Sequence, residues 1–182
     1  DTLHALAVEL WHKTHDEAPT LLNEESARRV FAEANGDSGS AKLRDAWDRI
    51  SLAREKREPL DDDLALINAR DSRQKGGRNL ADYTDLLEFW LEQIQTGLYT
   101  TPWTEILVDE IQDLSNLQLE LLRAILPQDG RGFFGIGDPD PRIYGFRGAP
   151  GQAHASFRAA WPDLAVISPR QHYRSPPVIP VS

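Results

Sequence analysis

The spacing of apolar and polar residues divides the chain into two regions. From about residue 14 to 79 the sequence is polar and acidic, and its apolar residues recur at the spacing of amphipathic helices. Capping residues and stop signals predict helices over 23–34, 40–57 and 62–69. The polar, Gly-rich stretch 71–78 predicts a loop. This region contains no chemical motif, so we interpret it as a helical scaffold or an inserted subdomain.

Beyond residue 79 the pattern predicts alternating helices and strands. Asn79 is the expected cap of a helix that ends at Gly97. Short apolar runs then alternate with capped amphipathic stretches, which predicts strands at 105–109, 132–137 and 164–168 and helices at 115–126 and 151–160. The first of these strands is expected to be buried on both faces. This rhythm is typical of an open parallel α/β sheet, which binds ligands at the carboxyl ends of its strands.

Acidic residues stand at the ends of two expected strands. Asp109 and Glu110 follow the first strand, and Asp138 follows the second. In phosphate-loop NTPases an acid in this position holds the Mg²⁺ that bridges the β- and γ-phosphates. A neighbouring acid can polarise the attacking water. On their own these acids fit a strand-end turn with solvated carboxylates as well.

Several segments together carry a family resemblance. Residues 109–118 (DEIQDLSNLQ) resemble motif II of the UvrD/Rep/PcrA-type superfamily 1 helicases. Residues 137–149 (GDPDPRIYGFRGA) resemble motif III, and residues 172–175 (HYRS) resemble motif IV. Upstream, residues 2–7 (TLHALA) are similar to motif Ib, and residues 82–87 (DYTDLL) to the aspartate-rich helix that precedes motif II. The order and spacing of these segments also agree with the family.

The resemblance implies a site for ATP and Mg²⁺. Asp109 would hold the metal, and Glu110 would act as the base toward the attacking water. Gln112 would contact the γ-phosphate and report its presence. Asp138 would connect the nucleotide site to the DNA site.

Motif IV would complete this site from the second motor domain. Tyr173 would stack near the adenine, and Arg174 would reach the γ-phosphate as an arginine finger does. Without the resemblance, both residues also fit a surface turn before Pro176.

The resemblance further implies contacts with single-stranded DNA. Tyr144, Phe146 and Arg147 would face the strand, and His4 would touch its backbone. An aromatic side chain suits this role, because every base has a face on which it can stack. The alternatives are that Tyr144 and Phe146 are core aromatics at strand spacing and that His4 is an ordinary residue at a helix start.

The chain departs from the family in two respects. It contains no Gly-x-x-x-x-Gly-Lys-Ser/Thr loop, and none of its four lysines follows a glycine loop. In the family this loop lies upstream of motif Ib, so we expect the chain to be an internal fragment that is inactive by itself. The second departure is Pro141, which stands where the family has a glutamine that senses the γ-phosphate.

Composition sets further limits. The chain has 182 residues and no cysteine, which excludes disulfides, thiolate-bound zinc and cysteine nucleophiles. Its net charge of −9 argues against a simple nucleic-acid coat, although residues 141–174 hold five arginines and one acid. No apolar run approaches the ~18 residues that span a membrane, and no secretory signal opens the chain. We therefore expect no membrane partner and a cytoplasmic location.

The combined expectation is a fragment of an ATP-dependent helicase that translocates on single-stranded DNA, in the 3′→5′ direction that the resemblance implies. The fold class would be α/β, a RecA-like parallel sheet with a helical insertion resembling the family's 1B subdomain. The boundaries would be 1–13 for the start of a partial core (1A), 14–79 for the insertion, 80–168 for the core with motifs II and III, and 169–182 for motif IV and the start of the second motor domain. A helicase-like module that binds DNA or protein without hydrolysis, and the motor part of a helicase-nuclease, remain alternatives.

Overall fold

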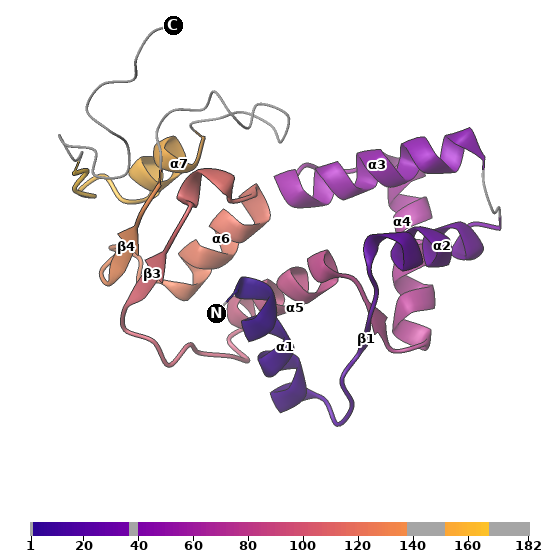
Figure 1. Ribbon diagram of the computed structural model, residues 1–182, viewed down its shortest axis with the longest axis horizontal. Coiled ribbons are helices and arrows are strands. Elements are labelled where there is room, and N and C mark those ends of the chain that lie inside the picture. Colours follow the sequence, from indigo (N-terminus) through magenta and orange to yellow (C-terminus); the bar gives the residue numbers. More distant parts are fainter. Residues whose placement is uncertain (1, 37–39, 138–151, 168–182) are drawn as a thin grey trace, which may run out of the picture.

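The fold is known from a computed structural model that describes residues 2–36, 40–137 and 152–167. Its elements, in chain order, are α1 (Leu3–Thr14), β1 (Thr20–Leu21), α2 (Glu24–Ala34), α3 (Ala41–Lys56), α4 (Asp62–Gly77), β2 (Leu80–Ala81), α5 (Tyr83–Gln95), β3 (Ile106–Val108), the 3₁₀ helix η1 (Ile111–Asp113), α6 (Asn116–Ile125), β4 (Phe133–Gly135) and α7 (Gln152–Ala160). Figure 1 shows α2, α3 and α4 gathered at one end, β3, β4, α6 and α7 at the other, and α1 and α5 between them.

Two short parallel sheets organise the chain. β1 pairs with β2, with Thr20 opposite Leu80. β3 pairs with β4, with Leu107 opposite Phe134. β1 precedes α2 and β2 follows α4. Because these two strands pair, the segment α2–α4 begins and ends at neighbouring positions (Figure 1). The described part of the chain is therefore α/β, as expected, with short parallel sheets and a large helical share.

Side-chain caps begin the helices of the excursion α2–α4. The side chains of Asn23, Ser40 and Asp61 each accept a backbone N–H three residues ahead, at 2.9, 3.2 and 2.9 Å. These bonds satisfy amide groups that a helix start leaves without partners. The helices predicted over 23–34 and 40–57 are thereby confirmed. A small core of Phe31, Ala46, Ile50 and Leu64 holds the three helices together.

The loop predicted over 71–78 is wrong, because α4 continues to Gly77. Each glycine in a helix costs about 1 kcal/mol relative to alanine, but Lys75 in this last stretch is only 2% exposed and makes three ion pairs. Tertiary contacts thus override local propensity. Asn79 is also not the cap of the next helix: it has a left-handed backbone (φ 50°), and the side chain of Asp82 caps α5 instead.

The main core lies where α1, α5 and α6 meet. α5 begins with a capping box in which Asp82 and Asp85 each accept the other's backbone N–H at 2.8 Å. Its apolar face then buries Leu86, Trp90 and Leu91 to 2% exposure or less. Each such side chain contributes roughly 1.5–3 kcal/mol through burial. This core fixes α6, which follows the acidic motif directly.

The sheet predictions hold only in part. β3 and β4 lie within the predicted runs 105–109 and 132–137, and α6 begins with the predicted Ser115–Gln118 capping box. β3 is not buried on both faces, since Leu107 is 73% exposed. Residues 164–167 of the third predicted strand form no strand. Leu164 instead donates its N–H to Trp161 in a turn after α7, a local bond that the apolar pattern did not indicate.

A buried charged network joins α4 to α5. The ammonium of Lys75 contacts Asp71 at 2.9 Å, Asp82 at 2.6 Å and Asp85 at 2.9 Å. Asp71 is 2% exposed, and its Oδ1 has no hydrogen-bond partner within the described residues. A single buried cation therefore neutralises carboxylates from two helices.

Arg54 brings α3 into the same network. Its guanidinium contacts Asp85 and Glu88 at 2.6 Å each and Asp82 at 3.4 Å. The contacts with Glu88 include both carboxylate oxygens, which is the strong, planar pairing of arginine. Two cations thus face four carboxylates, and the three helices share one electrostatic cluster, which we call the Lys75–Arg54 network.

The network shifts two aspartates in opposite directions. Burial would raise the pKa of Asp82, but the charges of Arg54 and Lys75 outweigh it and hold this pKa below its usual range. Burial raises the pKa of Asp71, and Lys75 offsets only part of that effect. Asp82 therefore stabilises the fold above the ordinary aspartate pKa of about 4, and this contribution is lost as pH falls through its lowered pKa. For Asp71 the sign is reversed: its contribution is present below about pH 4 and lost as pH rises through its raised pKa.

We predict that Asp82→Asn destabilises the protein at neutral pH by about 3–5 kcal/mol, because it leaves buried cations without a full partner. Asparagine remains a good helix cap, so capping is preserved. Asp71→Asn is the matched variant and should cost clearly less, since the fold already favours the neutral form of Asp71. Urea denaturation followed by tryptophan fluorescence measures both. An equal or larger loss for Asp71→Asn would contradict the assigned directions.

Candidate functional site

The acidic motif lies at the carboxyl end of β3, as the sequence predicted. β3 ends at Val108, and Asp109 and Glu110 follow it as exposed residues. The end of β4 lies beside this point, since Ile136 donates its N–H to the Val108 carbonyl at 2.8 Å. The carbonyl of Ile136 in turn accepts the N–H of Ile111 at 3.0 Å. Backbone bonds from β4 thus position the start of η1.

The backbone at Glu110 takes an uncommon form. Its φ is 52° and its ψ 45°, which is left-handed. Few residues other than glycine adopt this region, and the cost is about 1–3 kcal/mol. Three bonds hold the turn: Glu110 N–H donates to Oδ1 of Asp109 at 2.9 Å, Asp113 N–H donates to the Glu110 carbonyl at 2.9 Å, and Ile111 is bonded to β4. Ile111 is also 4% exposed, in a core with Phe157 and Trp161.

Gln112 and Glu110 lie in contact. Nε2 of Gln112 donates to Oε2 of Glu110 at 2.5 Å, a short hydrogen bond to a carboxylate. The two side chains that the sequence assigned to water activation and γ-phosphate sensing are therefore adjacent. Asp109 stands beside them, so the structure brings all three predicted residues of motif II together.

Gly137 lies against this pair. A Cβ at residue 137 would lie 2.5 Å from Oε1 of Gln112 and 2.6 Å from Cγ1 of Ile111. Both distances are shorter than van der Waals contact, so a side chain here would push the Gln112 amide aside. Glycine is therefore required by the close approach of the β4 end to η1. No sequence pattern indicates this role, because only the packing shows which atoms meet residue 137.

His4 lies in the first turn of α1, on the edge of Tyr83. The two rings meet at 82°, with centroids 5.2 Å apart. Burial lowers the pKa of His4, which favours the neutral imidazole. The side chain is partly buried. Its position agrees with the alternative that His4 is an ordinary residue at a helix start, and the DNA contact stays a prediction.

The remaining predicted site residues lie outside the described part of the chain. They are Asp138, Tyr144, Phe146 and Arg147 of the motif III segment and Tyr173 and Arg174 of motif IV, together with the unusual Pro141. Their roles therefore stay predictions from the resemblance.

The carboxylate of Asp109 fits a Mg²⁺ ligand. It is exposed at the strand end, and only its Oδ1 is engaged, with the N–H of Glu110. Among the described residues Oδ2 makes no hydrogen bond. Magnesium in nucleotide sites takes one or two carboxylates together with phosphate oxygens and waters, and the exposed carboxylate of Asp109 meets that requirement.

Comparison with known proteins places this geometry in a family. The family model of the UvrD/REP helicase N-terminal domain matches residues 2–161. The chain belongs to the UvrD/REP helicase family. The UvrD-type superfamily 1 resemblance is thereby confirmed.

Individual relatives agree with the family match. DNA helicase II of Escherichia coli is 36% identical over 101 residues, 53% of this chain and 14% of that protein. ATP-dependent DNA helicase UvrD1 of Mycobacterium tuberculosis is 31% identical over 129 residues, 63% of this chain and 17% of that protein. ATP-dependent DNA helicase Rep of Buchnera aphidicola is 32% identical over 102 residues, 53% of this chain and 15% of that protein. The chain thus spans a small part of the length of these helicases.

Within residues 2–36, 40–137 and 152–167, no helix is long and apolar enough to cross a membrane.

No sequence pattern indicates the Lys75–Arg54 network, although Asp82 and Asp85 belong to the aspartate-rich segment that carried part of the resemblance. Their partners, Lys75 and Arg54, are separated from them by 7 to 31 residues, and no spacing rule indicates such pairs.

We predict that Gly137→Ala destabilises the protein by about 1–3 kcal/mol, the usual cost of overpacking. The matched control is Gly76→Ala, since a Cβ at residue 76 meets nothing within 4 Å. Residue 76 lies in the last turn of α4, where alanine should stabilise the protein by less than the roughly 1 kcal/mol of a helix interior. Urea denaturation distinguishes the two; a neutral Gly137→Ala would show that η1 and the β4 end are not tightly packed.

Proposed function

We propose that this chain is part of the first motor domain of an ATP-dependent DNA helicase that translocates on single-stranded DNA in the 3′→5′ direction. The observation that carries the proposal is the contact of Glu110 and Gln112 beside Asp109 at the carboxyl end of β3. Ligands of open parallel sheets bind at that edge. The family match and the helicases among the relatives support the same activity.

In this proposal each residue of motif II has a distinct task. Asp109 would hold Mg²⁺ through its exposed carboxylate, and the ion would supply neutralisation of phosphate charge. Glu110 accepts a proton from the attacking water. Gln112 contacts the γ-phosphate and, through its bond to Glu110, relates the base to the presence of nucleotide.

The helical excursion has a proposed place in the same motor. The segment between β1 and β2 leaves and returns at neighbouring strands, as an inserted subdomain does. We propose that it is the 1B subdomain of the family, with boundaries near the 14 and 79 expected from the sequence. The phosphate-binding loop and most of the second motor domain would be supplied by other parts of the protein.

A second candidate function is a helicase-like module that binds DNA without hydrolysis. Pro141 favours it, because proline offers no polar side chain where the family has a glutamine. The contact between Gln112 and Glu110 and the exposed carboxylate of Asp109 beside them favour hydrolysis, so we rank the motor first.

The test is Glu110→Gln in the full-length protein. If Glu110 is the base, DNA-stimulated ATP turnover should fall by about 10²–10⁴-fold, the usual contribution of a positioned base. Because Gln keeps the size of Glu, binding of ATP should be retained. The matched control is Glu105→Gln, an exposed acid at the start of the same strand, which should leave turnover unchanged. Unchanged turnover in Glu110→Gln, or none in the parent protein, would favour the module without hydrolysis.

A second prediction concerns His4 as a DNA contact. Because burial lowers its pKa, we expect His4 to bind the backbone as a neutral donor and to add no charge. His4→Ala should weaken DNA binding of the full-length protein severalfold without changing the salt dependence of the affinity, which counts ionic phosphate contacts. Fluorescence anisotropy at several salt concentrations measures both. A reduced salt dependence would show that His4 binds as a cation.

A further inference from the structure

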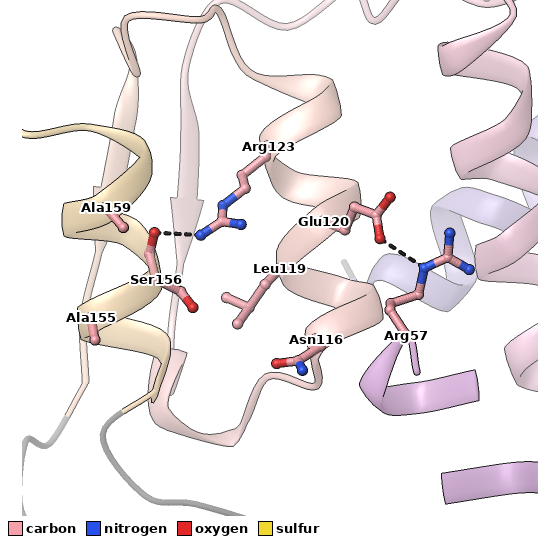
Figure 2. Close-up of a pocket in the computed structure, with 8 residues that line it drawn as sticks. All are labelled: Arg57, Asn116, Leu119, Glu120, Arg123, Ala155, Ser156 and Ala159. Carbon is pink, nitrogen blue, oxygen red and sulfur yellow. Dashed lines mark hydrogen bonds and ion pairs between the residues drawn. The ribbon is translucent and has the colours of Figure 1, made fainter. Parts of the chain in front are cut away.

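A pocket separate from the acidic motif opens between α3, α6 and α7 (Figure 2). Its volume is about 530 Å³, and its lining residues are Arg57, Asn116, Leu119, Glu120, Arg123, Ala155, Ser156 and Ala159. One wall is formed by small residues of α7. The opposite side carries two arginines and one acid, so the lining has a net positive charge.

Arg57 stands at the end of α3 and has donors to spare. It forms the C-cap of the helix with a left-handed backbone (φ 58°). Its guanidinium contacts Glu120 through Nε at 2.7 Å. Within the described residues, the two terminal nitrogens of Arg57 make no hydrogen bond. A guanidinium has five N–H donors, so four remain for a ligand.

Arg123 lines the pocket from the last turn of α6. One terminal nitrogen donates to the carbonyl of Ser156 on α7, and Figure 2 shows the other on the side of α6. Its Nε is buried and has no partner within the described residues. A buried donor without a partner costs about 1–3 kcal/mol, so the side chain of Arg123 gains from any rearrangement that gives this nitrogen an acceptor.

Glu120 is the acid of the lining, and it does not depend on Arg57 alone. Its other oxygen, Oε1, accepts the amide of Gln95 at 3.2 Å. The carboxylate therefore keeps a partner when Arg57 turns toward a ligand. Glu120 at present competes with any anion for Arg57.

We propose that this pocket binds a phosphodiester group of DNA, with Arg57 and Arg123 as its donors. Guanidinium groups match phosphate oxygens with paired, charge-assisted hydrogen bonds. The pocket is open and lies between helices of both ends of the molecule, so it can admit one phosphate of a continuous strand. The inference rests on the proposed function, because it adds a DNA contact to the motor outside the helicase motifs.

The test measures DNA affinity of the full-length protein by fluorescence anisotropy, from about 50 to 200 mM salt, with a single strand and with a tailed duplex. Arg57→Gln should weaken binding severalfold for every sequence and lower the slope of log affinity against log salt by about one. Arg57→Lys keeps the charge and should keep the slope. The duplex and single-strand arms show which form of DNA supplies the phosphate.

Glu120→Gln provides a test of opposite sign. Removing the competing carboxylate should strengthen DNA binding severalfold, an effect that misfolding does not produce. The matched control is Arg49→Gln. Arg49 belongs to α3, the helix that Arg57 caps, but it does not line the pocket and pairs with Asp61 at a distance of 3.0 Å. This variant should leave the affinity and the slope unchanged. Equal slopes for wild type and Arg57→Gln, with no gain in Glu120→Gln, would overturn the pocket as a DNA site. Failure of the wild-type protein to bind any DNA would instead overturn the proposed function itself.

Discussion

The buried ammonium of Lys75 is the contact on which the arrangement of the helices depends. It lies 2.6–2.9 Å from carboxylates of α4 and of the α5 start. Charges out of water are costly unless every partner is in place. Arg54 completes the set from α3. Because a shift of any of these helices would leave a buried charge without its partner, the network specifies one arrangement more strongly than apolar contacts alone would.

This constraint extends along the chain to the acidic motif. Asp82 and Asp85 pair with the network cations and at the same time form the capping box of α5. The network therefore fixes where α5 begins and which face it turns to the core. That face packs against Leu117 and Leu121 of α6, and α6 follows η1 after a short turn. The position of Asp109 and Glu110 thus depends on charges that lie in a different part of the molecule.

The sequence predicts local structure well where the signal is local. The caps at Asn23 and Ser40, the Ser115–Gln118 capping box and the strand before Asp109 are all set by neighbouring residues. The errors fall where distant contacts decide. α4 continues to Gly77 because Lys75 is held by residues of α5, and Asn79 takes a left-handed turn so that β2 can pair with β1.

The same division between local and distant contacts applies to the candidate site. Asp109, Glu110 and Gln112 are neighbours in sequence, so their grouping was predictable from the motif, whereas the role of Gly137 depends on how the end of β4 meets η1. The pocket of Arg57 and Arg123 joins residues of α3, α6 and α7 and carries no motif.

The turn at Glu110 connects the local structure of the acidic motif with its packing against the end of β4. A left-handed backbone at a non-glycine residue persists only where its surroundings hold it. Here the surroundings are the carboxylate of Asp109, the Ile136 carbonyl at the end of β4 and the buried Ile111. Gly137, the next residue after Ile136, touches Gln112 so closely that no side chain fits between them. Any displacement of the β4 end must therefore move Ile111 and Gln112, and through the 2.5 Å bond it reaches Glu110. Since motif III begins at Gly137, the structure offers a short physical connection between that segment and the proposed catalytic base.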